Sequence, residues 1–141
     1  MKNKKIIKKK LYKFLFLAAL LFFISYIFIY YIIKPHYDVV EYNLEGKKYR
    51  FYLSDNVDKW QRGLMYIKKL KDVDGMLFVF PERDYRVFYN KNTYLDIDIY
   101  WIDGSSVVGK NFLPSIKKSK KIIYITSPQK VDKVVELVRK E

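Results

Sequence analysis

Residues 75–81 of this 141-residue chain read Gly-Met-Leu-Phe-Val-Phe-Pro, and this stretch decides the fold. It is an uninterrupted apolar run of strand length, and it is closed by a proline that cannot donate a hydrogen bond to a neighbouring strand. Such a run is typical of a strand that is buried on both faces. We therefore expect residues 75–81 to form a central strand and the surrounding sequence to supply its neighbours.

Upstream of this strand, the sequence predicts a β-hairpin with one buried face. Residues 37–44 and 47–53 are two runs of strand length that flank Glu45-Gly46, a pair suited to a tight turn. Side chains in the second run alternate between two faces, one with Tyr49, Phe51 and Leu53 and the other with Lys48, Arg50 and Tyr52.

Downstream, the sequence predicts further strands at residues 86–91, 95–102, 107–113 and 121–126. Residues 95–102 alternate, so that Leu95, Ile97, Ile99 and Trp101 share a face opposite Tyr94, Asp96, Asp98 and Tyr100. A basic patch of Lys117, Lys118, Lys120 and Lys121 precedes the last strand. We expect a solvated loop there, or a contact with anionic headgroups if the patch lies beside a membrane.

Two helices are expected beside these strands. Ser54, Asp55 and Asn56 offer N-cap oxygens to a short helix through Trp60, which Gly63 ends. Near the C-terminus, Ser127 is suited to the N-cap of a second helix and Pro128 to its first position. The apolar stripe of that helix would be Val131, Val134, Val135 and Val138, at i, i+3, i+4 and i+7. About six strands with two helices make an α+β domain.

Residues 14–33 read FLFLAALLFFISYIFIYYII, twenty residues without a charge. At ~1.5 Å per residue, a helix of this length matches the ~30 Å hydrocarbon core of a bilayer. Bulky residues before Lys34 disfavour cleavage by a signal peptidase. The sequence therefore predicts a cytoplasmic basic tail at 1–13, a transmembrane anchor at 14–33 and an extracytoplasmic domain at 37–141, in a single-pass protein of the cell membrane.

The formal net charge of +13 suggests an anionic partner, but its distribution along the chain argues for topology instead. Seven of the 28 basic residues and none of the 15 acidic ones lie in residues 1–13, which leaves +6 on the rest. Juxtamembrane lysines hold a segment on the cytoplasmic side, so we expect the lipid bilayer and not nucleic acid as a partner. The chain has no cysteine and one histidine, His36, so we expect no metal site and no cofactor.

A set of short motifs resembles one protein family, known as domain of unknown function 192. The motifs are Gln61-Arg62-Gly63-Leu64-Met65, Gly75-Met76-Leu77-Phe78 with Phe80-Pro81, Phe88, Lys91-Asn92-Thr93, Ile97-Asp98-Ile99 and Ile102-Asp103. The resemblance covers about residues 47–127. It implies a strongly curved, mostly antiparallel, barrel-like sheet with flanking helices, in proteins that are often exported or tethered and have no agreed activity.

Three positions depart from the family pattern. Tyr89 and Asn90 stand where the family usually has Trp and Met, and Asp96 stands where it usually has proline. If these positions line a pocket, that pocket is more polar here than in the family.

The candidate ligand-binding residues are Lys91, Asn92, Thr93, Asp98, Asp103 and Arg62. The first three gather a cation, an amide and a hydroxyl at a strand end, where they could bind an anionic or carbohydrate group or only satisfy the backbone of a turn. The aspartates could work as paired carboxylates or form a solvated face. Arg62 is expected to brace one of them, or else to contact the ligand.

Three functions stay open from the sequence. The favoured one is a membrane-anchored extracytoplasmic binding or accessory module for an envelope glycan or a protein. The second is an envelope enzyme that uses Asp98, Asp103 and Lys91, although the chain lacks a Ser-His pairing, a cysteine and a phosphate-binding loop. The third is a structural scaffold, which a sealed core would favour over a concave pocket.

Overall fold

The computed structural model describes residues 2–33 and 36–140, without the side chains of residues 2–10 and 28–33. The chain divides into two compact units, Met1–His36 and Tyr37–Glu141. The first unit contains one helix, α1 (Lys2–Ile33). Among the described residues, no helix combines the length and the apolarity that crossing a membrane requires. The predicted basic tail and anchor fall in part on side chains that lie outside this description.

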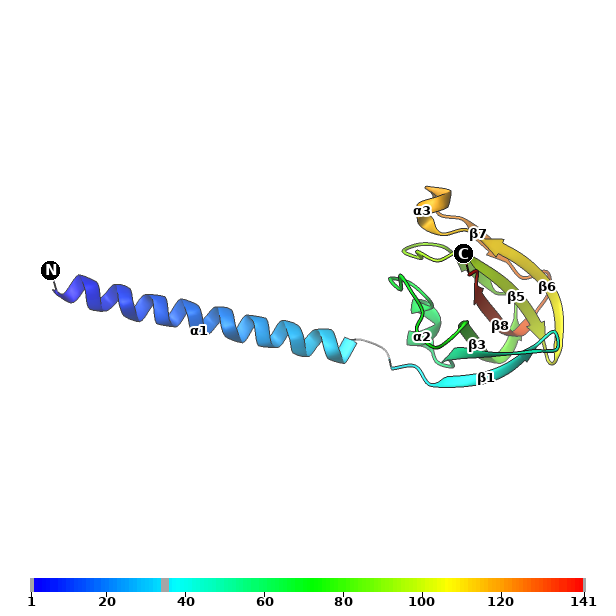
Figure 1. Ribbon diagram of the computed structural model, residues 1–141, viewed down its shortest axis with the longest axis horizontal. Coiled ribbons are helices and arrows are strands. Elements are labelled where there is room, and N and C mark those ends of the chain that lie inside the picture. Colours follow the sequence, from blue (N-terminus) through cyan, green and yellow to red (C-terminus); the bar gives the residue numbers. More distant parts are fainter. Residues whose placement is uncertain (1, 34–35, 141) are drawn as a thin grey trace. The chain divides into compact units, whose positions relative to one another are not determined.

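The second unit is built on a mixed six-stranded sheet with the order β1-β2-β3-β8-β5-β6 (Figure 1). Strands β2 and β3 pair in parallel, and the other neighbours in this sheet pair antiparallel. Strands β4 and β7 form a separate antiparallel pair. The strands are β1 (Val39–Leu44), β2 (Lys47–Ser54), β3 (Gly75–Asp84), β4 (Val87–Tyr89), β5 (Ile97–Asp103), β6 (Ser106–Leu113), β7 (Tyr124–Thr126) and β8 (Val131–Val138).

The α+β class is confirmed, with α2 (Val57–Arg62) and α3 (Ile116–Ser119) as short flanking helices. The six-stranded sheet curves strongly, as Figure 1 shows, but it stays open because β1 and β6 each have one neighbour. The expected barrel-like closure is therefore wrong.

The two faces of the sheet carry separate apolar clusters. The first cluster includes Phe78 and Trp101, and it is covered by Leu64 after α2 and by Phe88 of β4. The second cluster includes Phe51 of β2 and Tyr100 of β5 on the opposite face. Both faces of strand β5 are therefore buried near Tyr100. The Tyr100 side chain lies on the face that the sequence predicted to be solvated, but it is buried in the second cluster.

The predicted C-terminal helix is wrong, because residues 131–138 form the strand β8 between β3 and β5. Consecutive side chains of β8 enter opposite clusters, with Val134 in the first and Val135 in the second. A run of valines buried on both faces contains the i, i+3, i+4 spacing by chance, and β-branched side chains favour the strand. The proposed N-cap, Ser127, instead accepts a hydrogen bond at Oγ from the backbone N–H of Arg86 at 3.0 Å.

Upstream, the local predictions are confirmed. Glu45 and Gly46 both have positive φ, 50° and 82°, as a tight hairpin turn between β1 and β2 requires. Of the three candidate N-caps, the structure selects Asn56, whose side chain accepts a hydrogen bond from the N–H of Lys59 at 3.1 Å. Gly75 at the start of β3 lets β8 approach closely, because an added Cβ would lie 1.8 Å from the carbonyl oxygen of Glu136.

Candidate functional site

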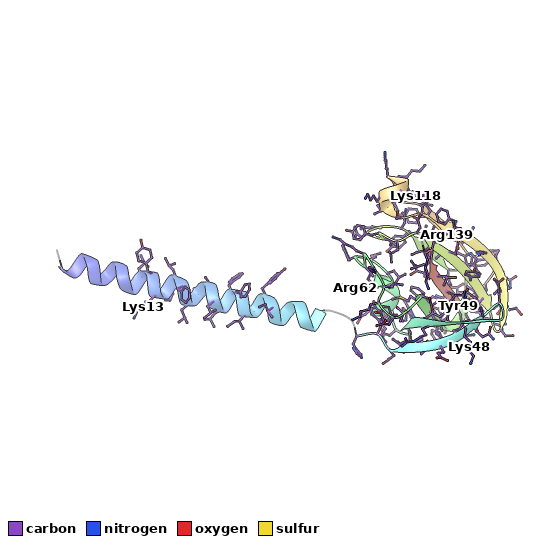
Figure 2. The ribbon with its side chains drawn as sticks, viewed as in Figure 1. Lys13, Lys48, Tyr49, Arg62, Lys118 and Arg139 are labelled. Carbon is purple, nitrogen blue, oxygen red and sulfur yellow. The ribbon has the colours of Figure 1, made fainter. Side chains whose placement is uncertain are left out.

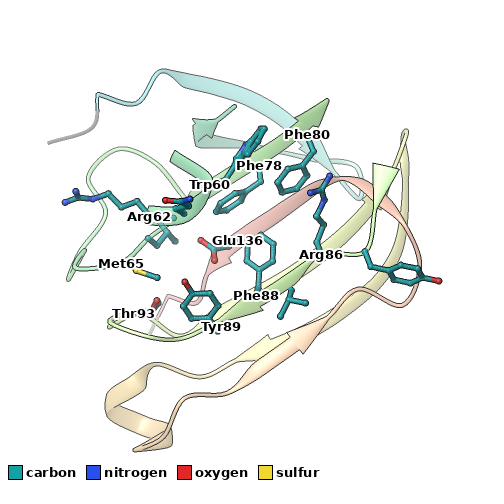
Figure 3. Close-up of a pocket in the computed structure, with 15 residues that line it drawn as sticks. Trp60, Arg62, Met65, Phe78, Phe80, Arg86, Phe88, Tyr89, Thr93 and Glu136 are labelled. Carbon is teal, nitrogen blue, oxygen red and sulfur yellow. The ribbon is translucent and has the colours of Figure 1, made fainter. Parts of the chain in front are cut away.

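A cavity of about 350 Å³ lies between two walls on the first-cluster side of the sheet. One wall is the end of α2 with the loop after it, and the other is β4 with the turn before it (Figure 3). We call it the Glu136 cavity. It is lined by Trp60, Gln61, Arg62, Gly63, Leu64, Met65, Phe78, Phe80, Tyr85, Arg86, Val87, Phe88, Tyr89, Thr93 and Glu136.

Glu136 places a carboxyl group in the middle of this apolar surface. It lies on β8, in register with Met76 of β3 and Ile99 of β5, and the whole residue is only 5% exposed. Burial raises the pKa of Glu136 to about 8, although a hydrogen bond from the N–H of Leu64 acts in the opposite direction. The carboxyl group is therefore mostly protonated at neutral pH.

One oxygen of this carboxyl group lacks a hydrogen-bond partner in the part of the chain that the structure describes. Glu136 Oε2 is buried and makes no hydrogen bond with any described residue. Buried polar groups are nearly always hydrogen-bonded, so an unpaired oxygen that faces a cavity needs a partner from outside the chain. In Figure 3 the carboxyl group of Glu136 points into the space between the two walls.

Gly63 keeps the space over this carboxyl group open. A Cβ added there would lie 3.4 Å from Phe78 Cζ and 3.8 Å from Glu136 Oε2. The residue ends α2 with φ +49°, a conformation that side-chain-bearing residues rarely adopt. The same glycine thus ends the helix and leaves the carboxyl group accessible from the cavity.

Aromatic rings line much of the rest of the cavity. Phe78 and Phe88 meet edge to face with ring centroids 4.9 Å apart, and Trp60 and Phe80 pack with centroids 5.2 Å apart. The Arg86 guanidinium lies over the Phe80 ring, with Cζ 3.9 Å from its centroid. Rings fixed in this way supply rigid apolar contact area for a ligand.

The predicted Lys91-Asn92-Thr93 segment lies at one end of the cavity. Asn92 Nδ2 donates to the Tyr66 hydroxyl at 2.7 Å, and the backbone carbonyl oxygen of Asn92 accepts from the Tyr66 N–H at 2.8 Å. These bonds tie the loop after α2 to the turn after β4. Thr93 is buried and lines the cavity, whereas Lys91 is exposed. Asn92 therefore holds the end of the cavity together, as the turn interpretation of this segment expects.

The predicted aspartates lie elsewhere. Asp98 Oδ1 accepts a hydrogen bond from Arg139 Nη2 at 2.7 Å. Asp103, five residues further along the same strand, forms an ion pair with Arg83, at 2.8 Å between Oδ1 and Nε. Arg62 lines the cavity from α2. It lies apart from Arg139, the partner of Asp98, in Figure 2. Of the six candidates, the structure brings Arg62 and Thr93 to one cavity and leaves both aspartates in separate ion pairs.

The three departures from the family pattern have different roles in the structure. Tyr89 lines the cavity, so it adds a hydroxyl-bearing ring there. Asn90 is buried outside the cavity lining, where its Nδ2 donates to the carbonyl oxygen of Pro114 at 2.8 Å and its Oδ1 accepts from the N–H of Ile123 at 2.8 Å. Asp96 accepts from the N–H of Ser115 at 2.8 Å. The expectation of a more polar pocket therefore applies to Tyr89 alone.

Sequence reasoning missed Glu136 and Arg86. The helical interpretation of residues 131–138 placed Glu136 outside the apolar stripe, where a glutamate needs no explanation. The available signal was a single acidic residue inside Val134-Val135-Glu136-Leu137-Val138, which is anomalous if the segment is a central strand.

The sequence matches the family described as Uncharacterized ACR, domain of unknown function 192, over residues 40–140. A crystal structure from Sinorhizobium meliloti 1021, described as a proposed transcription regulator, is 27% identical with a TM-score of 0.58, over 74% of this chain and 84% of that one. A protein of unknown function from Novosphingobium aromaticivorans DSM 12444 is 20% identical with a TM-score of 0.58, over 72% and 73%, and shows the fold alone. No curated protein matches significantly.

Proposed function

The chain belongs to the domain of unknown function 192 family, and from that premise we propose that it is a membrane-anchored extracytoplasmic binding module whose ligand occupies the Glu136 cavity. The observation that carries this proposal is the unpaired, buried Oε2 of Glu136. An unmade hydrogen bond of a buried polar group costs roughly 1–3 kcal/mol. A ligand that supplies the missing partner would recover that free energy on binding.

The dimensions and surface of the cavity support a small ligand or a short segment of a larger one. Its volume of about 350 Å³ lies near the lower end of the ~300–1,000 Å³ that ligand sites span. Its walls combine aromatic rings with a few polar groups, which is the usual composition of such sites. A glycan ring or a peptide side chain would each find apolar contact and a hydrogen-bond partner here.

The anchor is the second part of the proposal. Its support is the uncharged stretch at residues 14–33 and the lysine-rich segment before it, which together favour an N-terminus in the cytoplasm. Large apolar side chains along α1 also favour lipid as their surroundings, for Phe16 is 72% and Phe22 81% exposed. A module held in this way would bind its ligand in the cell envelope.

The enzyme interpretation finds less support. Asp98 and Asp103 are five residues apart on one strand, which separates their Cα atoms by about 17 Å at ~3.3 Å per residue. Paired carboxylates that share acid and base roles in hydrolysis lie closer, within ~5–10 Å. A scaffold with a sealed core is likewise disfavoured by the open cavity.

A thermal-shift screen of sugars and short peptides tests the binding proposal, because a ligand that binds only the folded state raises Tm by mass action. Met65 lines the cavity and is partly exposed, so Met65→Trp fills the cavity from its outer side. The matched control is Val57→Trp, on an exposed position of α2 that does not line the cavity. A true ligand stabilises the wild type and Val57→Trp but not Met65→Trp. Equal stabilisation of all three places the ligand elsewhere and contradicts the proposal.

A further inference from the structure

Strand β4 presents a free edge. In the β4–β7 pair, the N–H of Ser127 donates to the carbonyl oxygen of Arg86 at 2.9 Å, and the N–H of Asn90 donates to that of Ile123 at 3.3 Å. In an antiparallel pair, every second residue of a strand forms hydrogen bonds with the partner strand. Arg86, Phe88 and Asn90 therefore bond to β7 and the residues beside it. The N–H and C=O groups of Val87 and Tyr89 point away from β7.

These outward groups find no partner among the described residues of the domain. Over residues 36–140, the N–H and C=O groups of Val87 and Tyr89 take part in no turn, loop or side-chain hydrogen bond. Unpaired groups along a strand edge are a template for the backbone of another extended chain.

The free edge of β4 borders the Glu136 cavity. The Phe88 side chain packs in the first cluster, while Val87 and Tyr89 face the opposite side of the strand, yet all three line the cavity. A space that touches residues from both faces of a strand lies along its edge. Because β7 occupies the other edge, the cavity runs along the free one.

The charge of the lining favours an acidic ligand. Its two cationic residues are Arg62 and Arg86, and its one acidic residue is Glu136. Arg86 Nε is also buried without a hydrogen-bond partner among the described residues. A protonated Glu136 adds no negative charge to oppose this, and it can donate a hydrogen bond to a carbonyl oxygen.

From these observations we infer that the ligand is an extended, acidic polypeptide segment that pairs its backbone with the free edge of β4 and inserts one side chain into the Glu136 cavity. This inference rests on the proposed binding function and names the class of its ligand. The backbone bonds would supply affinity and the cavity would select the inserted side chain. The arginines would favour acidic residues on either side of it.

The test is residue-resolved amide hydrogen exchange by NMR on the full chain in detergent micelles. The probe is a library of capped pentapeptides with aspartate at both ends, threonine at the second and fourth positions and a varied apolar residue in the centre. The Val87 and Tyr89 amides should exchange rapidly in the free protein and at least tenfold more slowly with a bound peptide. Glu41 provides a control, because its N–H points outward from the edge strand β1 and Glu41 does not line the Glu136 cavity.

Two variants of one position separate the backbone contact from the side chain. Val87→Pro removes an edge N–H that no described residue uses, and Val87→Ala removes the side chain but keeps that N–H. Loss of one hydrogen bond should weaken peptide binding about tenfold in Val87→Pro and much less in Val87→Ala. Should Val87→Pro fail to fold, the same peptides with N-methylated backbones make the comparison on the wild type.

The outcomes distinguish the two proposals. Protection of Val87 and Tyr89 without protection of Glu41, lost with N-methylated peptides, supports the inference. Ligands that shift the resonances of Glu136 without protecting either amide overturn it and leave the binding module intact. Slow exchange of both amides in the free protein also overturns it. Protection of Glu41 to the same degree indicates non-specific edge pairing and overturns it as well. A chain that binds neither peptides nor sugars at this cavity rejects both proposals.

Discussion

Replacing the buried acid Glu136 by glutamine should stabilise the domain at alkaline pH. Burial raises the pKa of Glu136 to about 8 in the folded chain, from an ordinary value of 4.5. Below pH 4.5 the carboxyl group is protonated in both the folded and the unfolded chain, so it contributes no pH dependence there. Between pH 4.5 and 8 the unfolded chain loses this proton first, and the free energy of unfolding falls as pH rises.

The size of this loss follows from the shift. Each pKa unit corresponds to about 1.4 kcal/mol, so a difference between about 8 and 4.5 amounts to about 5 kcal/mol above pH 8. Native domains of this size are stable by roughly 5–15 kcal/mol, so the wild type should approach unfolding in mild alkali. Glutamine keeps the shape and still accepts the hydrogen bond from Leu64, but it does not ionise. The Glu136→Gln variant should therefore be about 3–5 kcal/mol more stable than the wild type at pH 9, and similar to it at pH 4.

Urea unfolding of residues 37–141, followed by tryptophan fluorescence between pH 4 and 9, measures this difference. Glu82→Gln is the matched control, because Glu82 is exposed and its substitution changes the same formal charge. Parallel stability curves for the wild type and Glu136→Gln would refute the reasoning. A gain of the same size in Glu82→Gln would assign the effect to net charge and not to the buried site.

Three further outcomes are expected. Asn90→Ala should lower the free energy of unfolding by about 2–4 kcal/mol, because the backbone groups of Pro114 and Ile123 lose their hydrogen-bond partner. Asn43 is exposed, so Asn43→Ala should change the free energy of unfolding little in the same urea titration. Residues 37–141 alone should unfold in one cooperative transition, because both apolar clusters lie within them, and a gradual transition would contradict this. Protease added to intact cells should remove an epitope tag placed after residue 141, and a protected tag or a mature chain that begins after residue 33 would contradict the proposed topology.

Local rules predicted the parts of the fold in which one face is buried or a cap is required. The hairpin before Ser54 and the Asn56-capped α2 needed only neighbouring residues, and both are confirmed. Strand β8 needed knowledge of its neighbours, because valines in a row satisfy a helical stripe and a doubly buried strand equally well. Its place between β3 and β5 is set by pairings between residues more than 30 positions apart, which spacing along the chain does not show.

The candidate site was predicted in part for the same reason. Arg62 and Thr93 were found because they stand in short motifs, and the structure brings both to the cavity. Asp98 and Asp103 were candidates for paired carboxylates because they share a strand, but each forms an ion pair with an arginine. Glu136 was missed because its burial follows from the position of β8, and only the assembled sheet shows a carboxyl group facing an open cavity.

The claim that Glu136 contacts the ligand is tested most directly by the pH titration of its side-chain carboxyl carbon in ¹³C NMR, with and without the most stabilising ligand of the screen. In the free chain this carboxyl group should titrate with a pKa of about 8. The ligand should move both its chemical shift and its midpoint, because it provides the partner that Oε2 lacks. A midpoint near 4.5, or a titration curve that the bound ligand leaves unchanged, would contradict the account.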